Sequence, residues 1–187
     1  MQEALDRAAE APLPRTLIDI LRDTTEQYPD ASAVEDADGA VSYAELLAQV
    51  WRTAAVLREQ GVSQGDRVGI RMTSGRRDLY IAILGAMAAG AAYVPVDADD
   101  PQERADLVFR EARIVGMITD AGYLPADTSD ARQLFSSAAP HPSTSAVPVV
   151  TPPTVDDDAW IIFTSGSTGV PKGVAVSHRS AAVSYTH

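Results

Sequence analysis

The chain has 187 residues, a hydrophobic content of 45% and a formal net charge of -11 at pH 7. This length is enough for one domain with a hydrophobic core, and the acidic balance argues against binding to nucleic acid or anionic lipid, whose phosphates favour Lys and Arg clusters. The chain lacks cysteine, and it has neither the run of ~20 apolar residues that a membrane span needs nor the pattern of a signal peptide, so we expect a cytoplasmic protein without disulfides or membrane contact.

The first elements are a leader and a short helix. Residues 1–15 are rich in Ala and Pro and are predicted to be a leader or linker, so the domain is predicted to span 16–187. Thr16 begins the helix, with Asp19 three residues later as the partner of a capping box. The helix should stop before Pro29, because the residue before a proline disfavours the helical conformation.

A hairpin and a longer helix come next. Asp38 and Gly39 lie between two short apolar runs and predict a tight turn. Ser42 and Glu45 form a second capping box, which begins a helix that should end near Gly61.

The middle of the chain alternates strands with helices. Asp100 is predicted to cap the helix that starts at Pro101, with Glu103 completing the capping box. Strand, helix, strand, helix, strand is typical of a parallel sheet with right-handed crossovers, so the predicted fold class is α/β with a largely parallel sheet. The predicted elements are a strand at 68–72, a helix at 76–89, a strand at 91–96, a helix at 101–112 and a strand at 114–119.

Residues 121–157 differ in composition, because Pro, Ser, Thr, Ala and Asp dominate and the periodicity is weak. We predict a surface excursion there, with Val147–Val150 as a candidate strand. After the excursion, Trp160–Phe163 predicts a buried strand and Val174–Val176 a shorter one. Ser177 is predicted to cap a last helix.

A ten-residue segment rich in glycine and hydroxyl side chains, TSGSTGVPKG, follows the strand 160–163 directly. Glycines at 166, 169 and 173 let backbone amides approach a polyanion without interference from a Cβ, and the hydroxyls add donors that rotate. Lys172 is the only Lys among the fifteen basic residues, and it supplies a compact charge that can reach a phosphate. The segment therefore predicts a phosphate-binding loop.

Other glycine-rich loops fit the segment less well. A Walker loop needs Gly before the Lys and Ser or Thr after it, whereas Pro171 and Gly173 flank Lys172. The glycine spacing also differs from that of a dinucleotide fingerprint. A flexible linker or an ordinary turn between strands stays open as a structural alternative. The three histidines show no metal-ligand spacing, so no metal site is expected.

The ordered string TSGSTGVPKG resembles the signature loop of the adenylate-forming superfamily, which comprises acyl-CoA synthetases, luciferases and the adenylation domains of nonribosomal peptide synthetases. Further segments match in the expected order. Val41–Leu46 resembles the first core motif of the peptide synthetase branch, Ala89–Asp97 the second, and Pro101–Arg104 the stretch after it. Val174–Ser180 resembles the segment after the loop. The string at Ala89–Asp97 favours amino-acid activation.

The resemblance implies a chemistry for the full enzyme. Such an enzyme binds ATP with Mg²⁺ and an amino acid, forms an aminoacyl adenylate and releases pyrophosphate. A phosphopantetheine thiol on a peptidyl carrier protein then takes the acyl group, as in antibiotic biosynthesis. In this scheme the β- and γ-phosphates are held by the loop residues Thr164, Ser165, Gly166, Ser167, Thr168, Gly169 and Lys172.

The resemblance also implies parts that would follow His187: the amino-acid pocket, the adenine and ribose contacts, an acidic residue near magnesium, and a small domain with a catalytic Lys. We therefore expect no catalytic residue and no metal ligand within this segment, and no activity without the remainder of the adenylation domain. Two alternatives stay open, namely a segment of an acyl- or aryl-acid-activating ligase and a non-catalytic nucleotide-binding or scaffold remnant.

Overall fold

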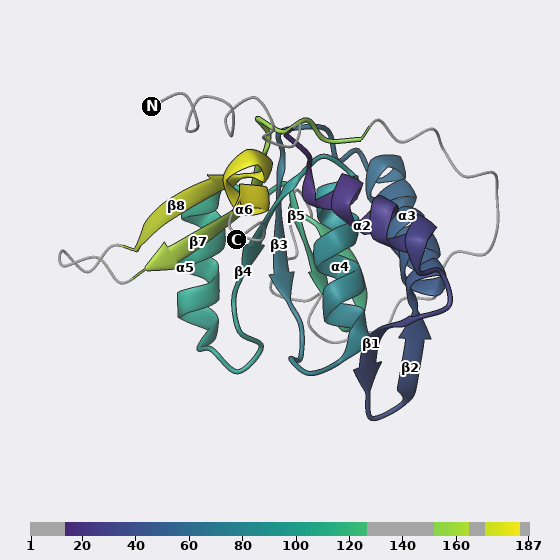
Figure 1. Ribbon diagram of the computed structural model, residues 1–187. Helices are drawn as coiled ribbons and strands as arrows, with labels where there is room; N and C mark the ends of the chain where they lie inside the picture. Colours follow the sequence, from purple (N-terminus) through teal and green to yellow (C-terminus); the bar gives the residue numbers. More distant parts are fainter. Residues whose placement is uncertain (1–13, 127–151, 165–170, 184–187) are drawn as a thin grey trace, which may run out of the picture.

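The computed structural model describes residues 14–126, 152–164 and 171–183. In chain order the elements are α2 (Leu17–Gln27), β1 (Ser32–Asp36), β2 (Gly39–Ser42), α3 (Tyr43–Glu59), β3 (Arg67–Arg71), α4 (Arg77–Ala88), β4 (Ala92–Pro95), α5 (Gln102–Ala112), β5 (Gly116–Thr119), β6 (Gly122–Pro125), β7 (Asp158–Thr164), β8 (Lys172–Ser177) and α6 (His178–Val183). The main sheet has the strand order β6-β5-β3-β4-β7-β8, and β1 pairs with β2 in a separate hairpin (Figure 1).

The four inner strands of the main sheet, β3, β4, β5 and β7, run parallel. The edge strands β6 and β8 each run antiparallel to their neighbour. The predicted α/β class with a largely parallel sheet is therefore confirmed. Because the inner strands are parallel, their carboxyl ends meet along one edge of the sheet, where ligands bind in open α/β sheets.

Both predicted capping boxes are present at the first two helices. The hydroxyl of Thr16 accepts a hydrogen bond from the amide of Asp19 at 3.0 Å, and the carboxylate of Asp19 accepts one from the amide of Thr16 at 3.0 Å. Ser42 and Glu45 exchange the same pair of bonds at the start of α3. These boxes satisfy amides that the first helical turn leaves without partners, so the sequence determines where both helices begin.

The predicted cap of α5 is wrong. Pro101 holds the N-cap position, and the helix start has no side-chain cap bond. Asp100 lies one residue too early to reach the first turn, and its carboxylate instead accepts a hydrogen bond from Nε of Arg104 at 2.9 Å. Arg113, with a φ of 53°, ends the helix in the left-handed region that usually favours glycine.

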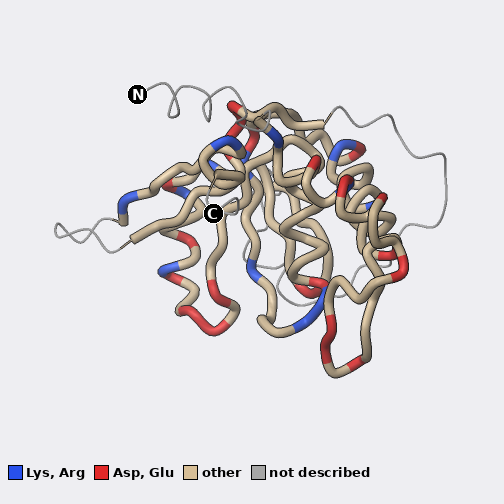
Figure 2. Tube along the Cα trace, in the orientation of Figure 1, with Lys and Arg blue, Asp and Glu red and all other residues tan. Residues whose placement is uncertain are grey.

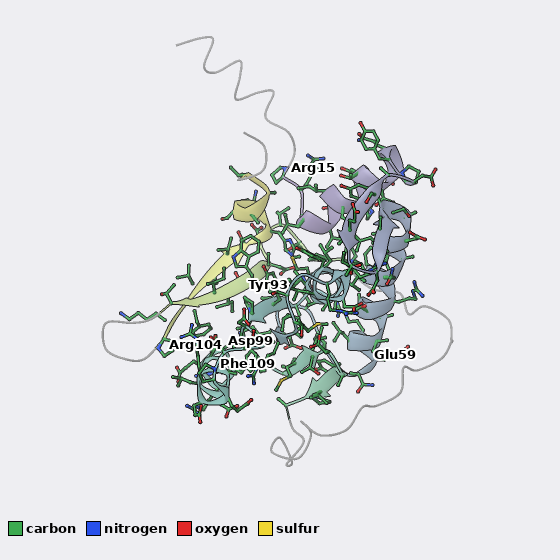
Figure 3. The ribbon with its side chains drawn as sticks, turned by 90° about the horizontal axis from the view of Figure 1, so that it is seen from below. Arg15, Glu59, Tyr93, Asp99, Arg104 and Phe109 are labelled. Atoms are coloured by element: carbon green, nitrogen blue, oxygen red, sulfur yellow. The ribbon has the colours of Figure 1, made fainter. Side chains whose placement is uncertain are left out.

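Two hydrophobic cores lie on opposite faces of the sheet. The larger core joins α2, α3 and α4 to one face, and its fully buried side chains include Ile18, Val50 and Val68. The smaller core joins α5 to the other face through Val94, Val108 and Phe109. Figure 3 shows Phe109 on α5 at one side of the molecule and Glu59, the last residue of α3, at the other. The connections β3–α4–β4 and β4–α5–β5 therefore cross opposite faces of the sheet.

The excursion predicted at 121–157 contains a strand that the sequence did not reveal. β6 pairs with β5 through a tight turn, in which Gly122 has a φ of +115°. The strand after the excursion begins at Asp158, two residues earlier than predicted. The candidate strand Val147–Val150 and most of the leader lie outside the described residues.

Among the helices that are described, none has the length and apolarity to cross a bilayer.

Candidate phosphate-binding hairpin

The predicted phosphate loop connects the two strands of an antiparallel hairpin. β7 and β8 pair from Asp158 opposite Ser177 to Thr164 opposite Lys172, which is the last described pair before the tip. Both Thr164 and Lys172 are exposed. The structure therefore places the first and last predicted phosphate-binding residues directly opposite each other. The other predicted phosphate-binding residues lie outside the described residues: Ser165, Gly166, Ser167, Thr168 and Gly169.

The last described pair of the hairpin, Thr164 and Lys172, lies at the carboxyl edge of the parallel strands. β7 runs parallel to β4, with Tyr93 opposite Trp160, so Thr164 ends β7 at the edge where β4 also ends. The turn that follows β4 is held by Arg71, whose Nη2 donates to the carbonyl of Asp100 at 2.8 Å and whose Nη1 donates to Gln102. Acidic residues gather in this turn and in the hairpin β1–β2 (Figure 2).

The two faces of the β7–β8 hairpin differ. Ile161 and Phe163 point toward α5 and pack on the smaller core. On the opposite face Thr164 and Lys172 lie beside Ile162 and Val174, whose side chains are 46% and 56% exposed. Because strand residues alternate between faces, one face anchors the hairpin and the other leaves its cation and hydroxyl open to a ligand.

The base of the hairpin is fixed by buried polar contacts. The amide of Leu17, the first residue of α2, donates to Nδ1 of His178 at 3.3 Å. His178 is 1% exposed, and its own amide donates to the carbonyl of Asp157 at 3.0 Å. Because Nδ1 accepts, the imidazole must be neutral with its proton on Nε2. The sequence analysis missed this contact, since no local pattern links residues so far apart in the chain.

The pKa values of His178 and Asp157, which lie at this base, are both lowered, but for different reasons. Burial lowers the pKa of His178, although the carboxylates of Asp157 and Asp19 act in the opposite direction. Burial opposes ionisation of Asp157 too, but hydrogen bonds from Thr154 and Gln64 hold its pKa below the usual value. At neutral pH the base therefore contains a neutral imidazole beside a carboxylate that is already hydrogen-bonded.

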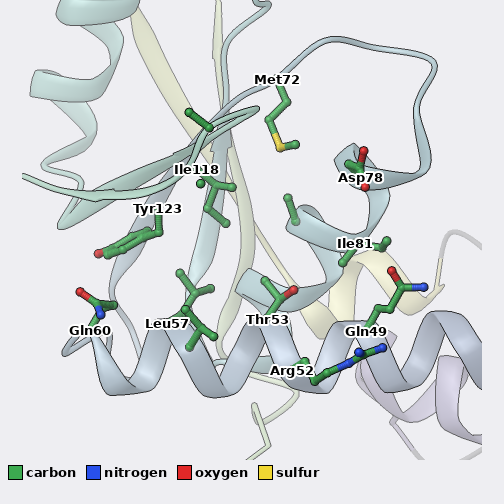
Figure 4. Close-up of a pocket in the computed structure, with 14 residues that line it drawn as sticks. Gln49, Arg52, Thr53, Leu57, Gln60, Met72, Asp78, Ile81, Ile118 and Tyr123 are labelled. Atoms are coloured by element: carbon green, nitrogen blue, oxygen red, sulfur yellow. The ribbon is translucent and has the colours of Figure 1, made fainter. Parts of the chain in front are cut away.

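A separate groove lies at the opposite edge of the sheet. It has a volume of about 690 Å³ and lies between α3, α4 and the β5–β6 hairpin (Figure 4). Leu57, Ile81 and Ile118 form its apolar floor, while Gln49 and Gln60 lie among the polar lining residues. Neither Thr164 nor Lys172, the two predicted phosphate-binding residues that the structure describes, lines this groove. We therefore assign the candidate site to the hairpin, where the cation and the hydroxyl lie opposite each other.

In the part of the chain that the structure describes, no three His, Asp or Glu side chains are arranged so that they could hold a metal ion. The described part of the candidate site thus offers a cation and hydroxyl donors, which suit a phosphate oxygen. Lys172 makes no ion pair with any described residue, and its ammonium is available to a ligand.

Comparison with known proteins agrees with the geometry. The pattern of the family described as AMP-binding enzyme matches residues 21–187. Syringomycin synthase SyrB1 of Pseudomonas syringae pv. syringae is 40% identical over 177 residues, which are 91% of this chain and 28% of that protein. The chain thus spans less than a third of this relative's length.

Solved structures show the same fold. The N-terminal subdomain of NpsA from Klebsiella oxytoca, in complex with 3-hydroxyanthranilyl-AMSN, superposes with a TM-score of 0.67 at 31% identity, covering 88% of this chain and 41% of that one. NpsA-ThdA, an artificially fused Adenylation-PCP di-domain NRPS from Klebsiella oxytoca, superposes with a TM-score of 0.69 at 29% identity, covering 90% of this chain and 34% of that one.

The nonribosomal peptide synthetase FmoA3, in an AMPPNP-bound form, has a TM-score of 0.69 at 35% identity, with coverage of 90% of this chain and 18% of that one. The family match covers nearly the whole chain, and the fold is that of an N-terminal subdomain. This chain belongs to the AMP-binding enzyme family.

Proposed function

We propose that this chain is the N-terminal part of the adenylation domain of a nonribosomal peptide synthetase. The full enzyme converts an amino acid and ATP into an aminoacyl adenylate and pyrophosphate. One observation carries the proposal: the hairpin places Thr164 opposite Lys172 on its open face, at the carboxyl edge of the parallel strands. Residues 16–187 then belong to the adenylation domain, and 1–15 precede it as a leader or linker.

The loop residues have a defined task in this proposal. Lys172 supplies a point charge, and the hydroxyls and glycine amides supply donors to the β- and γ-phosphates of ATP. Holding these phosphates stabilises the charge that develops as pyrophosphate leaves. The proposed site comprises Thr164, Ser165, Gly166, Ser167, Thr168, Gly169 and Lys172.

The proposal includes cofactors and partners that this segment does not provide by itself. Mg²⁺ enters with ATP. The described residues contribute hydrogen-bond donors to the phosphates and do not form a carboxylate cluster for the ion. The acyl group passes to the phosphopantetheine thiol of a peptidyl carrier protein, in keeping with the fused adenylation–carrier form of NpsA. The remainder of the adenylation domain supplies the amino-acid pocket and the catalytic Lys, and we place the enzyme in the cytoplasm.

A second candidate is an aryl-acid-activating ligase. NpsA has been solved with 3-hydroxyanthranilyl-AMSN and with 3-hydroxybenzoyl-AMSN, both of which carry an aryl acid. The fold of this segment is common to both candidates, because the residues that contact the substrate lie elsewhere in the full enzyme.

The test is ATP–pyrophosphate exchange by the full-length enzyme that contains this segment, assayed with each amino acid and with a set of aryl acids. Exchange that depends on one amino acid supports the proposal. Exchange that depends only on an aryl acid replaces it with the second candidate, and no exchange with any acid contradicts both. The 187-residue segment serves as the control, and we expect it to show no exchange.

A further inference from the structure

The last glycine of the loop motif, Gly173, does not need glycine for its backbone conformation. The described glycines with positive φ are Gly39, Gly61, Gly65, Gly75, Gly90 and Gly122, and Gly173 is not among them. It lies in regular β8 and pairs directly with Phe163 of β7. Any residue can adopt this backbone geometry, so the reason for glycine at this position must be steric or chemical.

A side chain at the exposed position 173 would collide with the side chains of β7 on the same face. A Cβ there would lie 2.9 Å from Cζ of Phe163 and 3.1 Å from Cγ2 of Ile161. Directly opposed residues of an antiparallel pair place their side chains on the same face, so the Phe163 ring occupies the space above Gly173. Gly173 therefore admits the ring, and this contact lies one residue from Lys172.

The half-buried ring of Phe163 is in contact with the layer behind it. Its other side packs on the smaller core, which includes Val108 and Phe109 of α5. The ring thus lies between α5 and the backbone of Gly173. Because Gly173 is exposed and the ring is half-buried, a Cβ inserted at this contact displaces either the strand or the ring.

We propose that Phe163 is a positioning residue for the phosphate site. Its ring sets the distance between β8 and the α5 layer, which holds the hairpin in one orientation. Lys172 and Thr164 consequently point away from α5, to the open face. Gly173 serves to accommodate this ring instead of contacting phosphate, in contrast to the sequence-based prediction that it belongs with the phosphate-approaching glycines. The inference rests on the proposed function for its kinetic consequence, but its structural part stands apart from it.

The kinetic test uses the full-length enzyme and ATP–pyrophosphate exchange. We expect Gly173→Ala to raise KM for MgATP roughly tenfold, as an inserted methyl shifts the strand that carries Lys172, and to leave KM for the acid substrate unchanged. Replacing Phe163 with Leu in the same chain opens space for the new methyl. The double variant Gly173→Ala/Phe163→Leu should therefore have a lower KM for MgATP than Gly173→Ala alone.

Gly69→Ala is the matched control. A Cβ at position 69 would lie 2.9 Å from Cε1 of Phe109, so this variant introduces a similar clash into the same layer, but on β3 and away from the hairpin. It should reduce the thermal stability and the active fraction without a change in KM for MgATP. An equal rise in KM in Gly69→Ala would overturn the inference, because it would show a general packing defect.

Amide hydrogen exchange separates this inference from the proposed function. If the wild-type enzyme shows no nucleotide-dependent activity, the proposed function fails and the kinetic comparison is silent. The β7–β8 amides still report on the contact: Gly173→Ala should accelerate their exchange, and the added Phe163→Leu should restore protection. If Gly173→Ala leaves these amides protected, or if Phe163→Leu alone leaves them as protected as in the wild type, the ring does not constrain the hairpin and the inference is wrong.

Discussion

Two of the three antiparallel hairpins that the structure describes, β1–β2 and β7–β8, are held by side-chain contacts at opposite ends. In β1–β2 the tip is fixed: Nε of Arg77 donates to the carboxylate of Asp36 at 3.0 Å, and its Nη2 donates to the carbonyl of Gly39 at 3.0 Å, on either side of the turn. In β7–β8 the base is fixed by His178 and Asp157, while the pair Thr164–Lys172 at the tip is exposed.

This difference separates a structural hairpin from one that is free to bind. The cation at the tip of β1–β2 is Arg77, the first residue of α4, and it is already neutralised within the fold because it forms a largely buried ion pair with Asp36 of β1. The cation of β7–β8 has no ion-pair partner among the described residues and lies where a ligand can reach it. The described end of β7–β8 therefore offers an exposed hydroxyl and an exposed cation, whereas the cation at the tip of β1–β2 is held within the fold.

Removing the free cation should have the largest effect. In the full-length enzyme we expect Lys172→Ala to lower kcat/KM for MgATP roughly a hundredfold, as for other charged groups aimed at a transferring phosphate. Arg22→Ala is the control, since Arg22 is also an exposed cation but lies on α2. Steady-state exchange kinetics provide the measurement. If both variants lose activity equally, the effect reflects net charge and the hairpin tip has no special role.

Removal of the His178 side chain at the base of β7–β8 should have the second largest effect. His178→Ala leaves the amide of Leu17 without its acceptor and creates a cavity, so we expect a loss of roughly 2–3 kcal/mol in stability, measured as a shift of the denaturant midpoint. His178→Asn retains an acceptor and should recover part of the loss. The comparison would fail if Asn were as damaging as Ala, because the hydrogen bond would then contribute nothing.

The tied tip of β1–β2 should respond to acid. Hydrogen bonds from the side chain and the amide of Arg77 hold the pKa of Asp36 well below its ordinary value of 3.8. Because the folded-state pKa is depressed, the stabilisation is complete above pH 3.8 and is lost as the pH falls from there toward the folded-state pKa. We therefore expect the Tm advantage of the wild type over Asp36→Asn to be constant near neutral pH and to shrink below about pH 4. An advantage that grew on acidification would contradict the ion pair.

The open face of β7–β8 should give the smallest effect. Ile162 and Val174 are exposed here, and we expect the remainder of the domain to cover them. Val174→Ser should then cost about 1 kcal/mol in the full-length enzyme, measured by thermal unfolding. Tyr28→Ser, on an exposed residue of the α2 cap, is the control for a surface substitution. No change in the Val174→Ser enzyme would indicate that this face stays in contact with water.

Local patterns predicted much of this fold. The boxes at Thr16 and Ser42 and the turn at Gly39 depend on contacts within a few residues, and all three are present. The cap of α5 was wrong because Pro101 shifted the helix start by one residue. β6 escaped prediction because its strand rests on a tertiary fit: Tyr123 lies over Gly116, where a Cβ would meet its hydroxyl at 2.3 Å.

The candidate site divides in the same way. Lys172 was predicted because it is the only Lys and lies within a recognisable string. Neither the pairing of Thr164 with Lys172 nor the contact of His178 with Leu17 was predicted, since register and long-range hydrogen bonds depend on how the sheet assembles. The sequence did contain one usable signal, because residues alternate between the two faces of a strand. Applied to β7, this alternation would have predicted that Phe163 points to the opposite face from Ile162 and Thr164.

The strand order has a consequence for synthesis on the ribosome. β4 pairs with β3 on one side as soon as both have emerged, but its other neighbour is β7, at Trp160. Until the ribosome has made that distant segment, the nascent chain presents an unpaired, apolar strand edge, which is a template for aggregation. The acidic turn that follows β4 contains Asp97, Asp99 and Asp100, and we expect its charge to oppose association with other nascent copies during that interval.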